Sequence, residues 1–538
     1  MKRINGTPTR LLRVKLLPGC LALALVVGSN VLSPEYANAQ ASLANASRSN
    51  EPFVAAAHTA GLPGPEWQAL IERMQSAART PPPVAAPSIA VSNCNDSGPG
   101  SYRQAVADAV SGDTIDLTST GCSTITLTTG DVLTFLNDLT LQGPGALTLT
   151  IDGGSLYRPL EHLGTGTLHI NDLSIADGKK YLADGGTGNA SGGCVHSQGV
   201  VSVDHAWVKY CDAGSSSTTI GVKGGAIYGK AGVTVLNSLV TGSTAHSSGN
   251  FAYGGGVYSA GDLAVVYSSI SGNTAHSTAS FGQGGGAEVG NFYTAGGTTF
   301  IKYSTVQNNV VIGIVGDGLG GGLYTTGNVY ILNSTIAGNQ ADFAGGLDLK
   351  KGATVTAPFS INSSTISGNN STGYIGGVYV GQNPTQINNS TIAFNTAHTN
   401  PKYGAGLKIN GAAVDLQSTI IARNTTDEGS GPLVDDVGGD SGASLTGANN
   451  LIFVSALATP PDTVVLTDPL LGSLSSNGGP TSTHALSPLS PAINTGNNSA
   501  SVSWDQRGSG YPRVIGAGPD IGAFELDLSD VIFANGFD

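Results

Sequence analysis

Residues 224–253 read GGAIYGKAGVTVLNSLVTGSTAHSSGNFAY, and residues 254–283 read GGGVYSAGDLAVVYSSISGNTAHSTASFGQ. The two segments are equally long, and their glycine, serine and apolar positions coincide. A unit that returns at a fixed period of this length is typical of a solenoid, in which each repeat forms one coil stacked on the coil before. Related units extend over residues 190–425, so the repeat sets the fold of the central part of the chain.

Three apolar columns mark the repeat. The first follows each glycine-rich triplet and consists of Val195, Ile227, Val257, Ala287, Leu323, Leu347, Val378 and Leu407. The second ends a pattern that is most often x-Ser-x-Val or x-Ser-x-Ile, and consists of Val208, Val240, Ile270, Val306, Ile336, Ile366, Ile392 and Ile420. The third lies five residues before the second, at Val203, Val235, Val265, Ile301, Ile331, Ile361 and Ile387. Since all three columns are apolar throughout, we expect all three to face a core.

The spacing of these columns predicts a bend. Residues five apart on one flat strand point to opposite faces of a sheet, so the second and third columns share a core only if the chain turns between them. Three inward columns per period therefore predict three short strands per coil. The predicted fold is all-β: a right-handed parallel β-helix with a repeat of about 30 residues, whose hand follows from the crossover rule.

Two polar columns run beside the apolar ones. Serines recur at the expected bend, at Ser238, Ser268, Ser304, Ser334, Ser364, Ser390 and Ser418. Asparagines recur just after the second apolar column, at Asn273, Asn309, Asn339, Asn369 and Asn395. Asparagine tolerates the left-handed backbone conformation of a sharp turn, and stacked amides bond to one another. Both columns predict coils in vertical register.

The composition agrees with a turn-rich β protein. Glycine accounts for 78 of the 538 residues, and charged residues for only 11 %. Glycine at this density disfavours long helices, where each glycine costs up to about 1 kcal/mol relative to alanine. The lack of a Gly-X-Y period excludes collagen, and an apolar fraction of 40 % excludes an intrinsically disordered chain.

The first 39 residues have the layout of a signal peptide. A basic segment that includes Lys2 and Arg3 precedes an apolar run over residues 16–28, which is too short to span a bilayer. The small-x-small motif that follows predicts cleavage near Ala39. A lipoprotein signal at Cys20 is disfavoured because the apolar run continues past that cysteine. We therefore expect a protein that is secreted or held on the outer cell surface, without a transmembrane segment.

The charge of the chain restricts its partners. The formal net charge is −13 at pH 7, which disfavours nucleic acid and anionic membrane surfaces. A polyanionic glycan would also be repelled unless a divalent cation such as Ca²⁺ bridged it. No other cofactor is predicted.

Four cysteines remain after the leader: Cys94, Cys122, Cys194 and Cys211. In an exported chain they predict two disulfides. Pairing of sequence neighbours, Cys94 with Cys122 and Cys194 with Cys211, is favoured among the three connectivities. Their spacings fit neither a zinc ribbon nor a CxxC redox motif.

The chain divides into five segments. They are a signal peptide (1–39), an Ala/Pro-rich linker (40–88), a β-helix with an N-terminal cap (89–425), a C-terminal module without the repeat (426–525) and a possible sorting tail (526–538). Inside the linker, residues 65–79 predict a short helix. Residues 101–110 predict an amphipathic helix that caps the first coil.

Both ends of the repeat resemble a known group of proteins. Residues 92–112 (SNCNDSGPGSYRQAVADAVSG) and the Gly-Pro-Gly at 143–145 are similar to the N-terminal cap of secreted pectin-lyase-like β-helix proteins. The C-terminal end resembles the choice-of-anchor Q domain in the segments 468–471 (DPLL), 477–481 (NGGPT), 490–493 (SPAI), 505–508 (DQRG) and 520–525 (DIGAFE). The resemblance implies a right-handed β-helix, bacterial export and association with the cell surface. It implies no activity.

The residue after each member of the first apolar column points away from the core. That position holds His196, Tyr228, Tyr258, Glu288, Tyr324, Asp348, Tyr379 and Lys408. Four tyrosines interleaved with ionisable side chains on one face predict a strip that stacks against sugars. The alternative, in which the stacked tyrosines only stabilise neighbouring coils, carries more weight from the sequence alone.

Three members of this strip have the chemistry of acid–base catalysis: Glu288, Asp348 and Lys408. Asp348 lies two coils from each of the others, which is about 10 Å at the usual strand spacing. That separation is too large for a working pair, so no catalytic residue is predicted.

Histidines recur in Thr-Ala-His triplets at His246, His276 and His398. The first two fall on adjacent coils and, with a carboxylate such as Asp262, have the chemistry of a metal site. A residue copied with the repeat explains them equally well, so no metal is predicted.

Two acidic groups lie beyond the repeat. Asp435 and Asp436 resemble a substrate-binding pair, but their context favours a structural role. The second group predicts an ion-pair cluster that holds the C-terminal module together, and consists of Arg507, Asp505, Asp520 and Glu525.

These features favour an exported, surface-associated β-helix that binds a glycan or another cell-surface component without catalysis. The alternative is a polysaccharide lyase or glycoside hydrolase on the same scaffold. A polygalacturonase-like enzyme needs aspartates clustered on adjacent coils and a Gly-His-Gly triplet. A pectate-lyase-like enzyme needs a calcium-binding acidic cluster beside a basic residue. The repeats contain neither.

Overall fold

The structure is a computed structural model that describes residues 88–528, apart from 187, 189, 291–295, 315–317, 354, 399–402, 428, 430, 458–463 and 466. The predicted signal peptide, the predicted helix at 65–79 and nearly all of the linker lie outside the described residues. So do residues 529–538 of the predicted tail.

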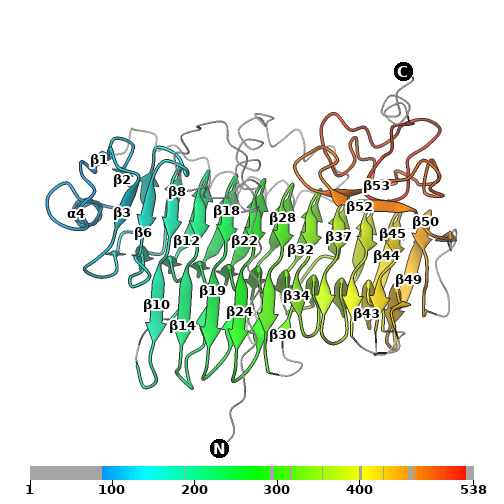
Figure 1. Ribbon diagram of the computed structural model, residues 1–538, viewed down its shortest axis with the longest axis horizontal. Helices are drawn as coiled ribbons and strands as arrows, with labels where there is room; N and C mark the ends of the chain where they lie inside the picture. Colours follow the sequence, from blue (N-terminus) through cyan, green and yellow to red (C-terminus); the bar gives the residue numbers. More distant parts are fainter. Residues whose placement is uncertain are drawn as a thin grey trace, which may run out of the picture.

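A short helix begins the fold. Helix α4 (Tyr102–Asp108) is capped by Ser101, whose hydroxyl accepts a hydrogen bond from the Gln104 amide (3.2 Å). Its buried side chains, Tyr102, Ala105 and Val106, join the main core. The predicted capping helix is therefore present at the first coil, at one end of the molecule (Figure 1). Among the described residues, no helix is long and apolar enough to cross a membrane.

The body is a stack of parallel coils along the long axis of the molecule (Figure 1). One coil consists of β16 (Ile227–Gly229), β17 (Gly232–Leu236), β18 (Leu239–Thr241), β19 (Thr244–Ser247) and β20 (Ala252–Tyr253). The next coil repeats the path, beginning with β21 (Val257–Ser259). Each strand hydrogen-bonds to its counterpart in the neighbouring coil, so every coil extends the same set of sheets.

Four long sheets and one short sheet result. Sheet 1 consists of β4 (Leu133–Thr134), β7 (Leu160–His162), β11 (Val195–Ser197), β16, β21, β26 (Ala287–Val289), β31 (Leu323–Thr325), β35 (Leu347–Lys350), β39 (Val378–Gly381), β43 (Leu407–Asn410) and β48 (Val437–Gly439). Sheet 2 runs from β1 (Ser88–Ala90) to β49 (Ser444–Ala448), sheet 3 from β3 (Thr124–Thr126) to β51 (Val464–Val465), and sheet 4 from β10 (Lys179–Leu182) to β47 (Leu433–Val434). Sheet 5 consists of β15 (Val222–Lys223), β20, β25 (Gly282–Gln283) and β30 (Gly318–Leu319).

The three predicted apolar columns each lie in a sheet of their own. The first column is in sheet 1, the third in sheet 2 and the second in sheet 3. Val235 pairs with Val265, and Val265 with Ile301, so the third column forms one vertical file. All three residues are buried in a single core that runs the length of the stack. The predicted parallel β-helix is confirmed.

Sheets 4 and 5 add strands to the three predicted for each coil. They pack against each other through small side chains: Ala213 and Ala245 of sheet 4 meet Val222 of sheet 5. Alanine leaves a weak apolar signal in a sequence, and this second core is separate from the main one. The periodicity of the large apolar residues therefore marked only the three sheets around the main core.

The predicted bend lies between sheets 2 and 3. Its first residue has a left-handed backbone, as at Asn237 (φ 45°), Tyr267 (φ 48°) and Asn333 (φ 49°). The predicted serine follows: the Ser268 hydroxyl accepts a hydrogen bond from the Ser238 amide (3.0 Å) and donates one to the Val266 carbonyl (2.8 Å). Each serine thus pairs the backbone of its own bend and that of the coil before.

The asparagines form a continuous buried ladder between sheets 3 and 4. Asn309 Nδ2 donates hydrogen bonds to Asn339 Oδ1 (2.9 Å) and to the Ile270 carbonyl (3.0 Å). The left-handed residue is the one before each asparagine, such as Gly338 (φ 64°), and not the asparagine that the sequence suggested. Asp436 ends the ladder, where its Oδ1 accepts from Asn424 Nδ2 (2.9 Å).

The parallel path continues past the predicted boundary at residue 425. Strands β48, β49 and β50 (Asn450–Ile452) pair with the preceding coil in sheets 1, 2 and 3. In this coil Asp436 occupies the ladder position and Gly438 pairs with Lys408 of sheet 1. The repeated residue types therefore change in this coil, while the chain follows the same path.

The C-terminal module lies against the outside of the last coils, at the end opposite α4 (Figure 1). It contains the antiparallel strands β52 (Leu471–Ser475) and β53 (Thr483–Leu486). Polar contacts fix it to sheet 3 and to the bend: Thr335 Oγ1 donates to the Ser482 carbonyl (2.6 Å), and Asn333 Nδ2 to the Asp505 carbonyl (3.0 Å). An apolar cluster with Ile420, Ile521 and Phe524 joins the two parts.

Both disulfides connect sequence neighbours, as predicted. Cys94 is bonded to Cys122, and Cys194 to Cys211. Cys194 and Cys211 are buried in the main core, and the first pair packs against that core beside the N-terminal cap.

Replacing Asn339 by alanine removes the amide from the middle of the ladder. Its neighbours then lose their partners in a buried site, so we expect the free energy of unfolding to fall by about 2–4 kcal/mol. Urea denaturation followed by circular dichroism measures this change. The control is Gln340→Ala, at an exposed position next in the chain, with an expected change below about 0.5 kcal/mol. Equal effects of the two substitutions would contradict a stabilising role of the ladder.

Candidate functional site

The eight residues of the predicted strip form one continuous row in sheet 1. His196 pairs with Tyr228, and the register continues through every later member to Lys408. In β21, Val257 belongs to the core and Tyr258 lies on the opposite, outer face of sheet 1. We call this row the floor; it consists of His196, Tyr228, Tyr258, Glu288, Tyr324, Asp348, Tyr379 and Lys408.

The floor differs from the prediction in its exposure. The sequence suggested an open face, but seven of the eight side chains are buried and Tyr228 is half-buried. At the N-terminal end the rings stack on one another, with centroids 4.7 Å apart for His196 and Tyr228 and 5.6 Å for Tyr228 and Tyr258. These three rings therefore make the contacts between neighbouring coils that the alternative interpretation expected, in which stacked side chains stabilise the coils.

A second row of side chains stands beside the floor, and the sequence analysis missed it. Lys223, Tyr253, Gln283 and Leu319 are in register along sheet 5. Phe343, Tyr374 and Tyr403 occupy the same position in the next coils, four residues before the first apolar column. We call this row the wall. Its signal in the sequence is a large side chain immediately before the turn that leads into sheet 1.

A tight turn places the wall against the floor. At Gly254 the backbone is left-handed (φ 63°), and a Cβ there would lie 2.3 Å from the Val257 carbonyl oxygen. Glycine is required at this turn for both reasons. The turn brings the wall over the floor: Lys223 Nζ lies 4.9 Å from the ring centre of Tyr258. The wall is one reason why the floor is buried.

The wall becomes exposed at its C-terminal end, while the floor beneath it stays buried. Tyr374 is 45 % exposed and Tyr403 is 40 % exposed, whereas Tyr253 and Gln283 of the same row are buried. Below them, Tyr379 accepts a hydrogen bond from Asn410 Nδ2 (2.6 Å), and Lys408 forms an ion pair with the exposed Asp440 (2.6 Å). This end of the corner is where a ligand from solvent has access.

Two carboxyl groups lie buried in the floor. Burial raises the pKa of Glu288 well above its ordinary value, and the Lys223 ammonium opposes that shift. Burial likewise raises the pKa of Asp348 to about 6, against the effect of Lys350, whose Nζ is 3.5 Å away. Tyr324 lies between the two, in register with both. They are therefore two coils apart, as predicted, about 10 Å at the usual strand spacing.

The predicted histidines do not converge on a carboxylate as suggested. His246 and His276 are in register on sheet 4, but Asp262 lies in sheet 2, where its Oδ1 accepts from the Thr298 amide. The carboxylate beside His246 is Asp212 (2.9 Å). In the described part of the chain, no group of three or more His, Cys, Asp or Glu residues is placed to hold a metal ion.

Asp435 and Asp436 have the structural contacts that their context suggested. Asp435 accepts a hydrogen bond from the Gly404 amide (3.0 Å), and Asp436 ends the asparagine ladder. Both side chains are buried.

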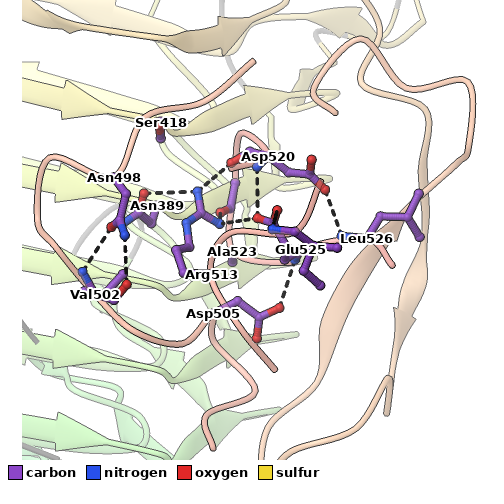
Figure 2. A network of polar contacts seen from close by, with 12 residues as sticks. Asn389, Ser418, Asn498, Val502, Asp505, Arg513, Asp520, Ala523, Glu525 and Leu526 are labelled. Carbon is purple, nitrogen blue, oxygen red and sulfur yellow. Dashed lines mark hydrogen bonds and ion pairs between the residues drawn. The ribbon is translucent and has the colours of Figure 1, made fainter. Parts of the chain in front are cut away.

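The predicted ion-pair cluster holds the C-terminal module, and its centre is a residue that the sequence analysis missed. Arg513 is fully buried and donates hydrogen bonds to Asn389 Oδ1 of the β-helix (3.1 Å) and to the Asp520 carbonyl (2.5 Å); Glu525 lies 3.6 Å away (Figure 2). Arg507 pairs with Asp505 (2.6 Å). Burial raises the pKa of Glu525 to about 8. The cluster therefore links the module to the coils.

Comparison with known proteins finds similarity among solved structures only. No protein-family model and no curated protein matches the sequence. A solved structure, the crystal structure of pectate lyase Pel9A, is similar with a TM-score of 0.39 and 15 % sequence identity, over 84 % of this chain and 100 % of that one. The class of protein rests on the coils themselves: a parallel β-helix with a packed C-terminal module.

Replacing Asp348 by asparagine tests the electrostatics of the floor. The folded-state pKa of about 6 exceeds the ordinary value of 3.8, so the folded protein binds the proton more tightly and this group lowers stability as pH rises from about 4 to 7. The variant lacks this loss, which amounts to at most about 3 kcal/mol. Urea titrations of both proteins at pH 4 and pH 7 measure the difference. The exposed Asp184→Asn variant should follow wild type, and a D348N variant that does the same would contradict the buried charge.

Replacing Arg513 by alanine leaves Glu525 and two carbonyls without their buried partner. We expect a loss of about 2–4 kcal/mol in the stability of the module, because the buried carbonyls of Asp520 and Gly522 lose their hydrogen-bond donors. Limited proteolysis and chemical denaturation detect it. The control is Arg423→Ala, whose ion pair with Asp468 lies on the surface, with an expected effect within about 1 kcal/mol. An unchanged module in R513A would contradict the linking role of the cluster.

Proposed function

We propose that this protein is exported, is associated with the cell surface, and binds a glycan or another cell-surface component without catalysis. The observation that carries the proposal is the corner of sheet 1. There the wall runs beside the floor of tyrosines and ionisable groups, and the wall is exposed at the aromatic residues Tyr374 and Tyr403. Amphipathic aromatic rings with a few placed polar groups are the usual lining of a site for a small polar ligand.

Export is supported by two independent features. The first residues have the basic, apolar and small-residue layout of a signal peptide. The structure contains two disulfides, and disulfides form and persist mainly in oxidising compartments outside the cytosol. The motifs similar to the choice-of-anchor Q domain support attachment to the cell surface.

A polysaccharide lyase or glycoside hydrolase is the second candidate, and the buried carboxyl groups of Glu288 and Asp348 favour it. A raised pKa suits a general acid near neutral pH. Their separation by two coils, with the buried Tyr324 between them, disfavours a shared reaction centre. The binding function therefore explains more of the corner than catalysis does.

A glycan panel separates the two candidates. We expect the purified protein to be retained on at least one glycan and to release no new chain ends from it, with or without Ca²⁺. Retention is measured by affinity electrophoresis, and release by assays for reducing ends and for unsaturated ends. New reducing ends would identify a hydrolase and unsaturated ends a lyase, and either would contradict the proposed function. The lack of any retention would contradict its glycan part.

A further inference from the structure

Three aromatic rings form the accessible part of the wall: Phe343, Tyr374 and Tyr403. We call them the aromatic edge. They occupy equivalent positions in three successive coils, and the neighbouring residues Ala344 and Ile375 pair in parallel. The ring centroids are 5.9 Å apart for Phe343 and Tyr374 and 5.7 Å apart for Tyr374 and Tyr403. The edge thus repeats once per coil, along the axis of the stack.

The edge stands on a rigid base. Phe343 packs against Tyr379 of the floor with a centroid distance of 5.0 Å, and Ala344 and Ile375 are buried beside them. Tyr374 and Tyr403 keep 45 % and 40 % of their surface exposed. Rigid aromatic rings lose little conformational freedom when a ligand covers them, which favours binding.

The lysines at the edge already have acidic partners. Lys350 Nζ lies 5.7 Å from the Phe343 ring centre and 3.5 Å from Asp348. Lys408 Nζ lies 4.9 Å from the Tyr403 ring centre and 2.6 Å from Asp440. Each cation is therefore compensated in place, and the whole chain carries a net charge of −13. The edge has aromatic surface and hydrogen-bonding groups without an uncompensated positive charge.

We infer that the aromatic edge binds an uncharged glycan whose extended chain runs parallel to the coil axis, with successive sugars on Phe343, Tyr374 and Tyr403 turned relative to one another as the ring planes are, by 54° and 72°. The inference rests on the proposed function and adds the place, the direction and the charge class of the ligand. Sugar rings present their C–H faces to aromatic rings, and an extended chain advances by about one coil spacing per sugar. A polyuronate would meet no uncompensated cation at the edge, on a chain whose net charge is −13.

The test uses uncharged β-1,4-linked oligosaccharides of glucose, mannose and xylose, one to six sugars long, and oligogalacturonates of the same lengths. Isothermal titration calorimetry on the full chain measures affinity. We expect the affinity for one uncharged series to rise up to three sugars, and the uronates to bind at least about tenfold more weakly. Tyr374→Ala and Tyr403→Ala should each weaken binding about tenfold.

Two further variants make the result specific. Tyr181→Ala removes a ring of similar exposure (49 %) from sheet 4 and should leave affinity unchanged. Asp440→Asn leaves Lys408 without its acidic partner. This variant should bind uronates more tightly than wild type does, so the difference in affinity between uncharged chains and uronates should become smaller. Because Tyr374, Tyr403 and Asp440 are exposed, thermal melts of these variants should match wild type, which excludes misfolding as the cause.

The outcomes separate the inference from the proposed function. Glycan binding that is unchanged in Y374A and Y403A would overturn the aromatic edge and leave the proposed function standing. Uronates bound as tightly as uncharged chains would overturn the charge class. No binding of any glycan by wild type would overturn the inference and the glycan part of the proposed function.

Discussion

Vertical register is the constraint on which the rest of this structure depends. Every coil must return to the same place, because its backbone amides and carbonyls bond to those of the coils on either side in the long parallel sheets. A coil out of step would also separate Val235 from Val265 and leave Asn309 without Asn339. Core, ladder and surface rows are therefore set together, and a side chain chosen at one position is stacked on its counterpart in the next coil.

The same register creates the candidate site. Side chains that follow the first apolar column form the floor, and those that precede the glycine turn form the wall. In the coils where this turn is a glycine, such as Gly254, the turn leaves no room for a Cβ and holds the two rows close together. Ionisable groups such as Glu288 are buried there because they stand between stacked neighbours, and their raised pKa is the consequence. Among the described wall residues, Tyr374 and Tyr403 are the most exposed.

The C-terminal module occupies a different side of the stack. It covers sheet 3 and the bend at Asn333 and Asn389, where Arg513 anchors it. The aromatic edge lies beside sheet 1, a different sheet from that of these contacts. The contacts that hold the module and the edge proposed to bind a ligand thus lie on different faces of the stack.

The amino-acid sequence by itself determined the repeat, the three core columns and the bend, because a period of about 30 residues and a column of large apolar side chains are visible without coordinates. It favoured one of three disulfide pairings, and the structure contains that pairing. It also placed all eight floor residues in one row. Only the tertiary structure decided which of them meet solvent, since burial depends on what folds over a face and not on the direction of a side chain. Sheets 4 and 5, held by alanines, and Arg513, which reaches Asn389 more than a hundred residues away, depend on contacts between distant segments that no local pattern records.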